Sequence, residues 1–150
     1  MEIKVITNSK EETKELGFQL GQLAKPQMVY TLTGDLGAGK TTLTQGIAKG
    51  LDIARTVSSP TFTICKIYHG RLDLYHFDAY RLEGLHQDLG FEEMIQGDGL
   101  TVIEWPMYIQ EIIGDEYLEI EIKLLDEDQR EFTLKSNGAT YEQLLGELKI

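Results

Sequence analysis

Gly34-Asp35-Leu36-Gly37-Ala38-Gly39-Lys40-Thr41 is the stretch of this 150-residue chain that decides its fold. It matches the phosphate-binding-loop pattern Gly-x-x-x-x-Gly-Lys-Thr at every fixed position. A β-rich run from Met28 to Thr33 precedes it, and Leu43, Ile47 and Leu51 follow it with helical spacing. The sequence therefore predicts a strand, a glycine-rich loop and a helix, in the order that this motif requires.

The loop is a candidate site for the phosphate groups of a nucleotide. Glycines permit left-handed backbone angles and a close approach to a ligand, so consecutive amides and the start of the next helix can point at a β-phosphate. Lys40 would add a positive charge between the β- and γ-phosphates, and the Thr41 hydroxyl is of the kind that binds Mg²⁺. The predicted nucleotide-binding residues are Gly34, Asp35, Leu36, Gly37, Ala38, Gly39, Lys40, Thr41 and Thr42.

Two carboxylates that follow β-rich runs are candidates for the metal ion. Glu104 comes after Thr101-Val102-Ile103, and Asp78 ends the run Tyr75-His76-Phe77-Asp78. Because Mg²⁺ beside the loop must be reached from a second strand, we predict that Thr41, Glu104 and Asp78 bind it. Lys40, Glu104 and Asp78 are the predicted catalytic residues, since hydrolysis also needs a group that orients water. The alternative for each carboxylate is an ordinary solvated residue at a strand end.

A hydroxyl-rich segment lies about twenty residues beyond the loop, at Ser58-Ser59-Pro60-Thr61-Phe62-Thr63. Hydroxyls around a rigid turn could sense a γ-phosphate, as switch regions do. An ordinary serine and threonine turn before a strand is the alternative.

The remaining patterns predict an α/β fold. Strands are expected at 2–6 and 100–105, and β-hairpins at 61–78 and 118–134. Helices are expected from the Ser9 capping box to Pro26, at 85–95, at 108–113, and from a Thr140 cap onward. No repeat or linker divides the chain. We therefore expect residues 1–150 to form a single P-loop ATPase domain, with a P-loop NTPase-like three-layer core, a mixed parallel and antiparallel sheet, and β-hairpins.

The acidic composition argues against unaided binding of RNA or DNA. The chain has 25 Asp and Glu residues against 14 Lys and Arg, a formal net charge of −11, which repels phosphate backbones. No apolar run approaches the roughly 18 residues of a membrane span, and the start is not that of a signal peptide, so we expect a cytoplasmic protein without a membrane partner. The single cysteine, Cys65, excludes an internal disulfide and is expected to be a small buried side chain.

ATP hydrolysis is favoured over two other uses of such a loop. The tetrapeptide Asn/Thr-Lys-x-Asp, through which GTPases normally read guanine, does not occur, and the four arginines lie too far apart to suggest the paired arginines of a kinase lid. ATP hydrolysis that drives a conformational switch needs only the loop, a carboxylate that binds Mg²⁺ and a group that orients water. A small-molecule or nucleoside kinase and a nucleotide-sensing regulatory module remain as alternatives.

Four segments in a fixed order carry a resemblance to a known family. They are Gly34 to Thr42, Ser58-Ser59-Pro60-Thr61-Phe62, His76-Phe77-Asp78-Ala79-Tyr80-Arg81 and Ile103-Glu104-Trp105-Pro106. Together they resemble the bacterial TsaE (YjeE-like) P-loop ATPases, which take part in making threonylcarbamoyladenosine beside the anticodon of tRNA. Ser58, where the family often has threonine, and Met107-Tyr108 depart from the family's pattern, so no role is assigned beyond Pro106.

The resemblance implies a small ATPase that associates with a two-subunit transferase core, TsaD and TsaB, and resets it by hydrolysing ATP. In that picture the loop and Lys40 hold the phosphates, Thr41 binds Mg²⁺, and Asp78 and Glu104 complete the metal and water arrangement. The acidic balance fits a subunit that meets protein while its partners hold the tRNA, although acidity also serves solubility alone.

Three other side chains near these segments have open roles. Trp105 resembles the family's tryptophan near the nucleotide, and a core aromatic is the equal alternative. Arg81 is a candidate for stabilising the transferring phosphate. His76 is expected to form a hydrogen bond or to pack, because the three histidines lack the spacing of a metal site.

Overall fold

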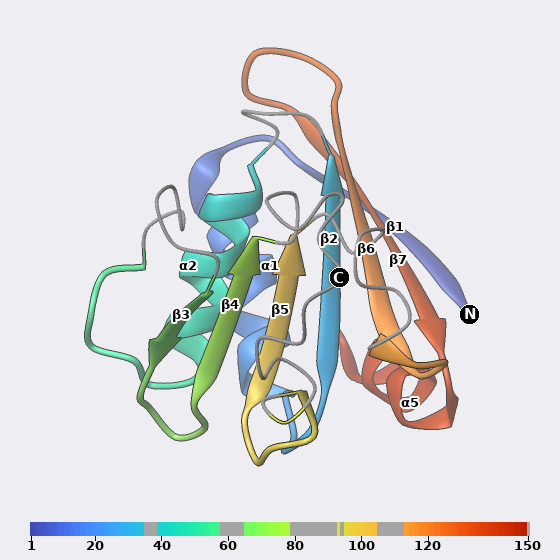
Figure 1. The fold of residues 1–150 in the computed structure, drawn as a ribbon. Helices are drawn as coiled ribbons and strands as arrows, with labels where there is room; N and C mark the ends of the chain where they lie inside the picture. Colours follow the sequence, from blue (N-terminus) through green and yellow to red (C-terminus); the bar gives the residue numbers. More distant parts are fainter. Residues whose placement is uncertain (35–38, 58–64, 79–92, 94, 105–112, 150) are drawn as a thin grey trace, which may run out of the picture.

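The structure is a computed structural model that describes residues 1–34, 39–57, 65–78, 93, 95–104 and 113–149. In this part of the chain seven strands form one sheet with the order β1-β7-β6-β2-β5-β4-β3 (Figure 1). The strands are β1 (Glu2–Thr7), β2 (Val29–Gly34), β3 (Cys65–Tyr68), β4 (Leu74–Asp78), β5 (Leu100–Glu104), β6 (Tyr117–Leu124) and β7 (Arg130–Asn137). The helices are α1 (Lys10–Gln22), α2 (Lys40–Gly50) and α5 (Ala139–Glu147).

The sheet is mixed, as the sequence predicted. β2 runs parallel to both β5 and β6, and β4 runs parallel to β5. β3 with β4 and β6 with β7 form the two predicted antiparallel hairpins, and β1 pairs antiparallel with β7. The carboxyl ends of β2, β4 and β5 therefore meet at one edge of the sheet, where the β6–β7 turn also lies (Figure 1).

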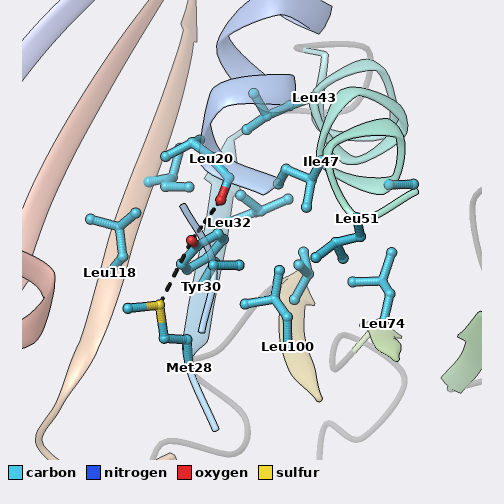
Figure 2. Close-up of a cluster of buried hydrophobic side chains, with 14 of the residues drawn as sticks. Leu20, Met28, Tyr30, Leu32, Leu43, Ile47, Leu51, Leu74, Leu100 and Leu118 are labelled. Carbon is cyan, nitrogen blue, oxygen red and sulfur yellow. Dashed lines mark hydrogen bonds between the residues drawn. The ribbon is translucent and has the colours of Figure 1, made fainter. Parts of the chain in front are cut away.

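The larger apolar core lies between one face of the sheet and the helices. Leu20 of α1 and Leu43 and Ile47 of α2 pack with Leu32 of β2 in this core (Figure 2). The Tyr30 hydroxyl donates to the Leu20 carbonyl oxygen at 2.8 Å, and complete burial raises the pKa of this phenol. A smaller cluster covers the opposite face and consists of Val29, Phe77, Ile95, Ile103 and Ile113. Apolar side chains are thus buried on both faces of the central strands, as expected where parallel strands form the middle of a sheet.

At both ends of α1, a side chain forms hydrogen bonds with backbone groups of the helix. The Ser9 hydroxyl caps the start by accepting a hydrogen bond from the Glu12 amide at 3.1 Å, which confirms the predicted capping box residue. The helix ends at Gln22, before Pro26. The Arg71 guanidinium donates to the Gly21 carbonyl oxygen at 2.8 Å, so a side chain distant in sequence closes the carboxyl end.

The predicted cap of the last helix is wrong. α5 begins at Ala139 after an N-cap at Gly138, which has φ of 113° and makes no side-chain cap, so Thr140 already lies within the first turn. Glycine adopts this backbone angle without strain and lets the chain enter the helix earlier. Leu148, expected within the helix, follows its end. The helices predicted at 85–95 and 108–113 fall almost wholly outside the described residues.

Helices α1 and α2 touch through backbone atoms. A Cβ added at Gly17 would lie 2.3 Å from the Leu43 carbonyl oxygen, and one added at Gly46 would lie 2.3 Å from the Lys14 carbonyl oxygen. Gly21 and Gly50 form equivalent contacts one turn further along both helices. Because the contacts advance along both helices together, α1 and α2 run parallel and their first turns lie at the same end.

We predict that Gly46→Ala destabilises the chain. Its methyl group would overlap the Lys14 carbonyl oxygen, and relief of such overpacking costs about 1–3 kcal/mol. Urea denaturation followed by circular dichroism should show the lower midpoint. Gly146→Ala is the matched control, because nothing lies within 4 Å of that position in α5, and alanine there should add about 0.5–1 kcal/mol of stability. Equal midpoints for Gly46→Ala and the unchanged chain would contradict the role given to the glycines.

Candidate functional site

A cleft of about 330 Å³ opens at the start of α2. Gly39 is the N-cap residue and has φ of 111°, the left-handed region that glycine adopts readily. It makes no side-chain cap for the amides of the first helical turn. Lys40, Thr41 and Thr42 line the cleft directly after it. This geometry suits an anion, because the amides and the positive end of the helix dipole point the same way.

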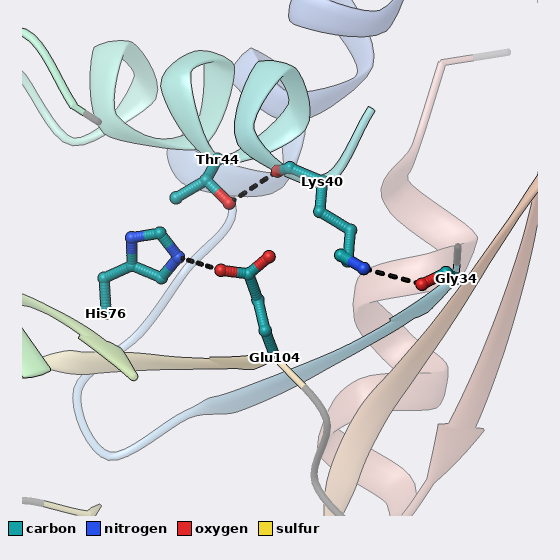
Figure 3. A network of polar contacts seen from close by, with 5 residues as sticks. All are labelled: Gly34, Lys40, Thr44, His76 and Glu104. Atoms are coloured by element: carbon teal, nitrogen blue, oxygen red, sulfur yellow. Dashed lines mark hydrogen bonds and ion pairs between the residues drawn. The ribbon is translucent and has the colours of Figure 1, made fainter. Parts of the chain in front are cut away.

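Lys40 is a nearly buried cation, with 6% of the residue exposed. Its ammonium Nζ donates to the Gly34 carbonyl oxygen at 2.6 Å (Figure 3). Gly34 is the last residue of β2. The positive charge is therefore held between the end of the strand and the first turn of the helix, which are the two ends of the glycine-rich segment.

Glu104 enters the cleft from the end of β5. It pairs in register with Leu32 of β2 on one side and with Asp78 of β4 on the other. Only 6% of its side chain is exposed, and its Oε2 lies 2.9 Å from Nε2 of His76, which confirms a hydrogen-bonding role for that histidine (Figure 3). The structure thus brings a buried carboxylate to the same cleft as Lys40 and Thr41.

Asp78 starts from the neighbouring position at the same sheet edge. Register pairing places it beside Glu104, one strand further from β2, and the residue is half-buried. Glu104 lines the cleft, whereas Asp78 is not among the described residues that line it. The two predicted metal carboxylates are therefore adjacent, but only Glu104 reaches the cleft wall in this structure.

Several predicted site residues lie outside the described part of the chain. These are the loop residues Asp35, Leu36, Gly37 and Ala38, the segment Ser58 to Thr63, and Arg81 and Trp105. Their roles remain predictions. Cys65, by contrast, is described and is half-buried, and desolvation raises the pKa of its thiol to about 12.

Residues from two further segments also line the cleft and were not predicted. Lys10 and Thr13 come from the first turn of α1, Asp128 comes from the β6–β7 turn, and Arg130 closes that turn as the first residue of β7. The Arg130 guanidinium donates to the Glu127 carbonyl oxygen at 3.0 Å, which fixes it within its own turn. The residues of this acidic turn, 126–128, are exposed, and Glu127 and Asp128 also line the cleft.

The cleft places three cations beside three carboxylates, Glu104, Glu127 and Asp128. Lys10, Lys40 and Arg130 line it, and α1 and α2 both present their amino-terminal ends. Glu104 and the Thr41 hydroxyl supply hard oxygen donors, the ligands that Mg²⁺ prefers. The described residues contain no group of three or more His, Cys, Asp or Glu that could hold a metal. Mg²⁺ fits this donor set, since it is usually held by one or two carboxylates with further oxygens from waters and phosphates.

Fold and cleft together define the class of protein. A mixed α/β sheet with a glycine-capped helix start beside a buried strand-end carboxylate is a P-loop NTPase-like architecture. No helix within the described residues is long and apolar enough to cross a membrane.

Comparison with known proteins identifies the family. Residues 7–132 match the family described as threonylcarbamoyl adenosine biosynthesis protein TsaE. The tRNA threonylcarbamoyladenosine biosynthesis protein TsaE of Bacillus subtilis is 48% identical, and the match covers 98% of this chain and 94% of the relative. The corresponding protein of Treponema pallidum is 37% identical over 88% of this chain and 99% of its own length. The chain belongs to the TsaE family, and so to the proteins of tRNA threonylcarbamoyladenosine biosynthesis.

A solved structure supports the same assignment. The crystal structure of YdiB from Bacillus subtilis superposes with a TM-score of 0.85 at 42% sequence identity, covering 98% of this chain and 93% of that one. The resemblance seen in four short sequence segments therefore extends over almost the whole fold.

Proposed function

We propose that this chain is a Mg²⁺-dependent ATPase that acts as an auxiliary subunit in the synthesis of tRNA N6-threonylcarbamoyladenosine, the modified adenosine beside the anticodon. One observation carries the proposal. The start of α2 and the buried Glu104, which are about sixty residues apart in sequence, converge on one cleft. Phosphoryl transfer needs this combination of anion-binding backbone, lysine, hydroxyl and carboxylate.

The residues divide the chemistry between them. The amides of the first turn of α2 and the Lys40 ammonium bind the phosphates of ATP, in place of the bond from Lys40 to the Gly34 carbonyl oxygen. Thr41 and Glu104 would hold Mg²⁺, with Asp78 as a further oxygen donor. When bound, Mg²⁺ would neutralise charge on the phosphate oxygens. Glu104 and Asp78 also orient the water that replaces the bridging oxygen at the γ-phosphorus, giving ADP and inorganic phosphate.

The proposed partner proteins are inferred from the net charge of the chain and from its family. A net charge of −11 favours contacts with protein over a direct grip on tRNA, so we expect little tRNA binding by this chain alone. The proposed partners are TsaD- and TsaB-like subunits, with ATP hydrolysis resetting that complex between rounds of carbamoyl transfer. Such a role places the chain in the cytoplasm and makes its hydrolysis slow until the partners bind.

Lys40→Ala should weaken ATP binding. Loss of a hydrogen bond from a charged group costs about 1.5–3 kcal/mol, which corresponds to roughly 10- to 150-fold in affinity. Isothermal titration with ATP and Mg²⁺ measures the change. Lys49→Ala is the control, because Lys49 is an exposed lysine in the last turn of the same helix. Equal ATP affinity in the Lys40→Ala and Lys49→Ala chains would rule out the proposed phosphate site.

Thr41→Ala, Asp78→Ala and Glu104→Ala should chiefly lower hydrolysis and its dependence on Mg²⁺. Each removes an oxygen donor from the proposed metal and water arrangement, and removal of a general acid–base group costs about 10²–10⁴ in rate. Phosphate release measured across a Mg²⁺ titration gives both quantities. Asp98→Ala is the matched control, an exposed carboxylate just before β5 at the opposite edge of the sheet. Normal turnover in all three site variants would remove the mechanism.

Reconstitution separates this function from its alternatives. Modification of tRNA by the TsaD and TsaB subunits should continue over repeated rounds only when this chain and ATP are present. With Glu104→Ala, repeated rounds should stop, because the core is no longer reset. Continued rounds would instead indicate a nucleotide-sensing module, and a phosphorylated small molecule or nucleoside that accumulates with added acceptor would indicate a kinase.

A further inference from the structure

His76 is a buried polar residue to which the proposed reaction assigns no step. It lies in the middle of β4, and its side chain is 0% exposed. Its register partner on β5 is Val102, and an aliphatic residue would also fill this position without desolvating two ring nitrogens. The imidazole must therefore be explained by a contact that it makes.

That contact is with the carboxylate in the cleft. His76 Nε2 lies 2.9 Å from Oε2 of Glu104 (Figure 3). An ionised carboxylate can only accept, so Nε2 carries the hydrogen. The other ring nitrogen, Nδ1, is buried without a hydrogen-bond partner in the described part of the chain. Within the described residues, the bond to Glu104 is thus the polar contact that this buried side chain makes.

The bond fixes the direction of a side chain that could otherwise rotate. Glu104 is the last residue of β5 and reaches its carboxylate over three rotatable bonds. With Oε2 held by His76, the second carboxylate oxygen turns toward the start of α2 and the Lys40 side chain (Figure 3). Thr44 does not compete for it, because its hydroxyl donates to the Lys40 carbonyl oxygen at 2.8 Å.

We propose that His76 is a positioning residue, whose Nε2–H holds Oε2 of Glu104 so that the remaining oxygen faces the start of α2. This assignment rests on the proposed function, in which Glu104 serves the Mg²⁺ and water arrangement. Groups behind a metal-binding or catalytic side chain commonly act in this way, by holding its orientation.

The hydrogen bond can be tested without nucleotide. Long-range ¹H–¹⁵N spectra of the full chain, labelled with ¹⁵N-histidine and recorded at one fixed pH, should show a histidine with its hydrogen on Nε2. That pattern should be lost in His76→Gln, shifted in Glu104→Ala, and unchanged in His69→Gln, whose parent side chain is 80% exposed. A hydrogen on Nδ1 of His76, or no response to Glu104→Ala, would overturn the proposal.

Kinetics test the consequence. His76→Leu keeps the bulk but has no donor, so kcat for ATP should fall about 10- to 100-fold while KM stays within about twofold. His76→Gln places an amide N–H near the position of Nε2 and should recover most of the loss, whereas the shorter His76→Asn should not. A folded His76→Leu chain with unchanged kcat, or a Gln variant no better than Asn, would count against positioning. A chain that hydrolyses no ATP would defeat the proposed function, while the spectra would still decide the hydrogen bond.

Discussion

The backbone contact between α1 and α2 is the constraint on which the cleft depends. Gly17 and Gly21 of one helix and Gly46 and Gly50 of the other allow carbonyl oxygens to approach where a methyl group would collide. Since the two helices run parallel, this contact brings Lys10 and Thr13 to the level of Lys40 and Thr41. A wider separation would leave α2 with its lysine and amides but without the wall that α1 supplies. Packing within the core thus sets the shape of the site.

The same arrangement bears on how an acidic chain could bind the phosphates of the proposed nucleotide. A net charge of −11 repels anions at long range, but exposed charges are screened beyond a Debye length of about 8 Å at physiological salt. Within that distance a ligand meets two helix amino-terminal ends and the cations Lys10, Lys40 and Arg130, with the carboxylates of Glu104, Glu127 and Asp128 beside them as possible partners for a bound cation. The local groups therefore decide affinity, while the outer charge discourages long polyanions such as tRNA from binding elsewhere on the surface.

The sequence revealed those parts of the fold and site that depend on local patterns. Alternating apolar residues predicted both hairpins, and the Ser9 capping box predicted the start of α1. The position of Glu104 at a strand end also marked it correctly as a cleft residue, because β5 pairs directly with the strand that enters the loop. Thr140 was misplaced because the turn at Gly138 starts α5 two residues earlier than a cap pattern suggests. Lys10 and Arg130 could not be predicted, since the contact between α1 and α2 brings Lys10 to the cleft and the pairing of β7 with β6, next to β2, brings Arg130 there. The four-residue spacing of glycines in α1 and α2 was visible in the sequence, but it does not by itself reveal which helix lies opposite.

The bond from Lys40 to Gly34 bears on how the proposed site would respond to a ligand. A buried ammonium without an acceptor would be strongly disfavoured, and the Gly34 carbonyl oxygen at 2.6 Å serves as that acceptor. When a phosphate binds, the Lys40 ammonium therefore exchanges its hydrogen bond to Gly34 for one to the phosphate. The net gain in free energy is smaller than the strength of either bond. The exchange also releases the carbonyl at the end of β2, where the strand enters the glycine-rich segment. In the proposed function, phosphate binding would thus be linked to the end of β2 through the Lys40 side chain.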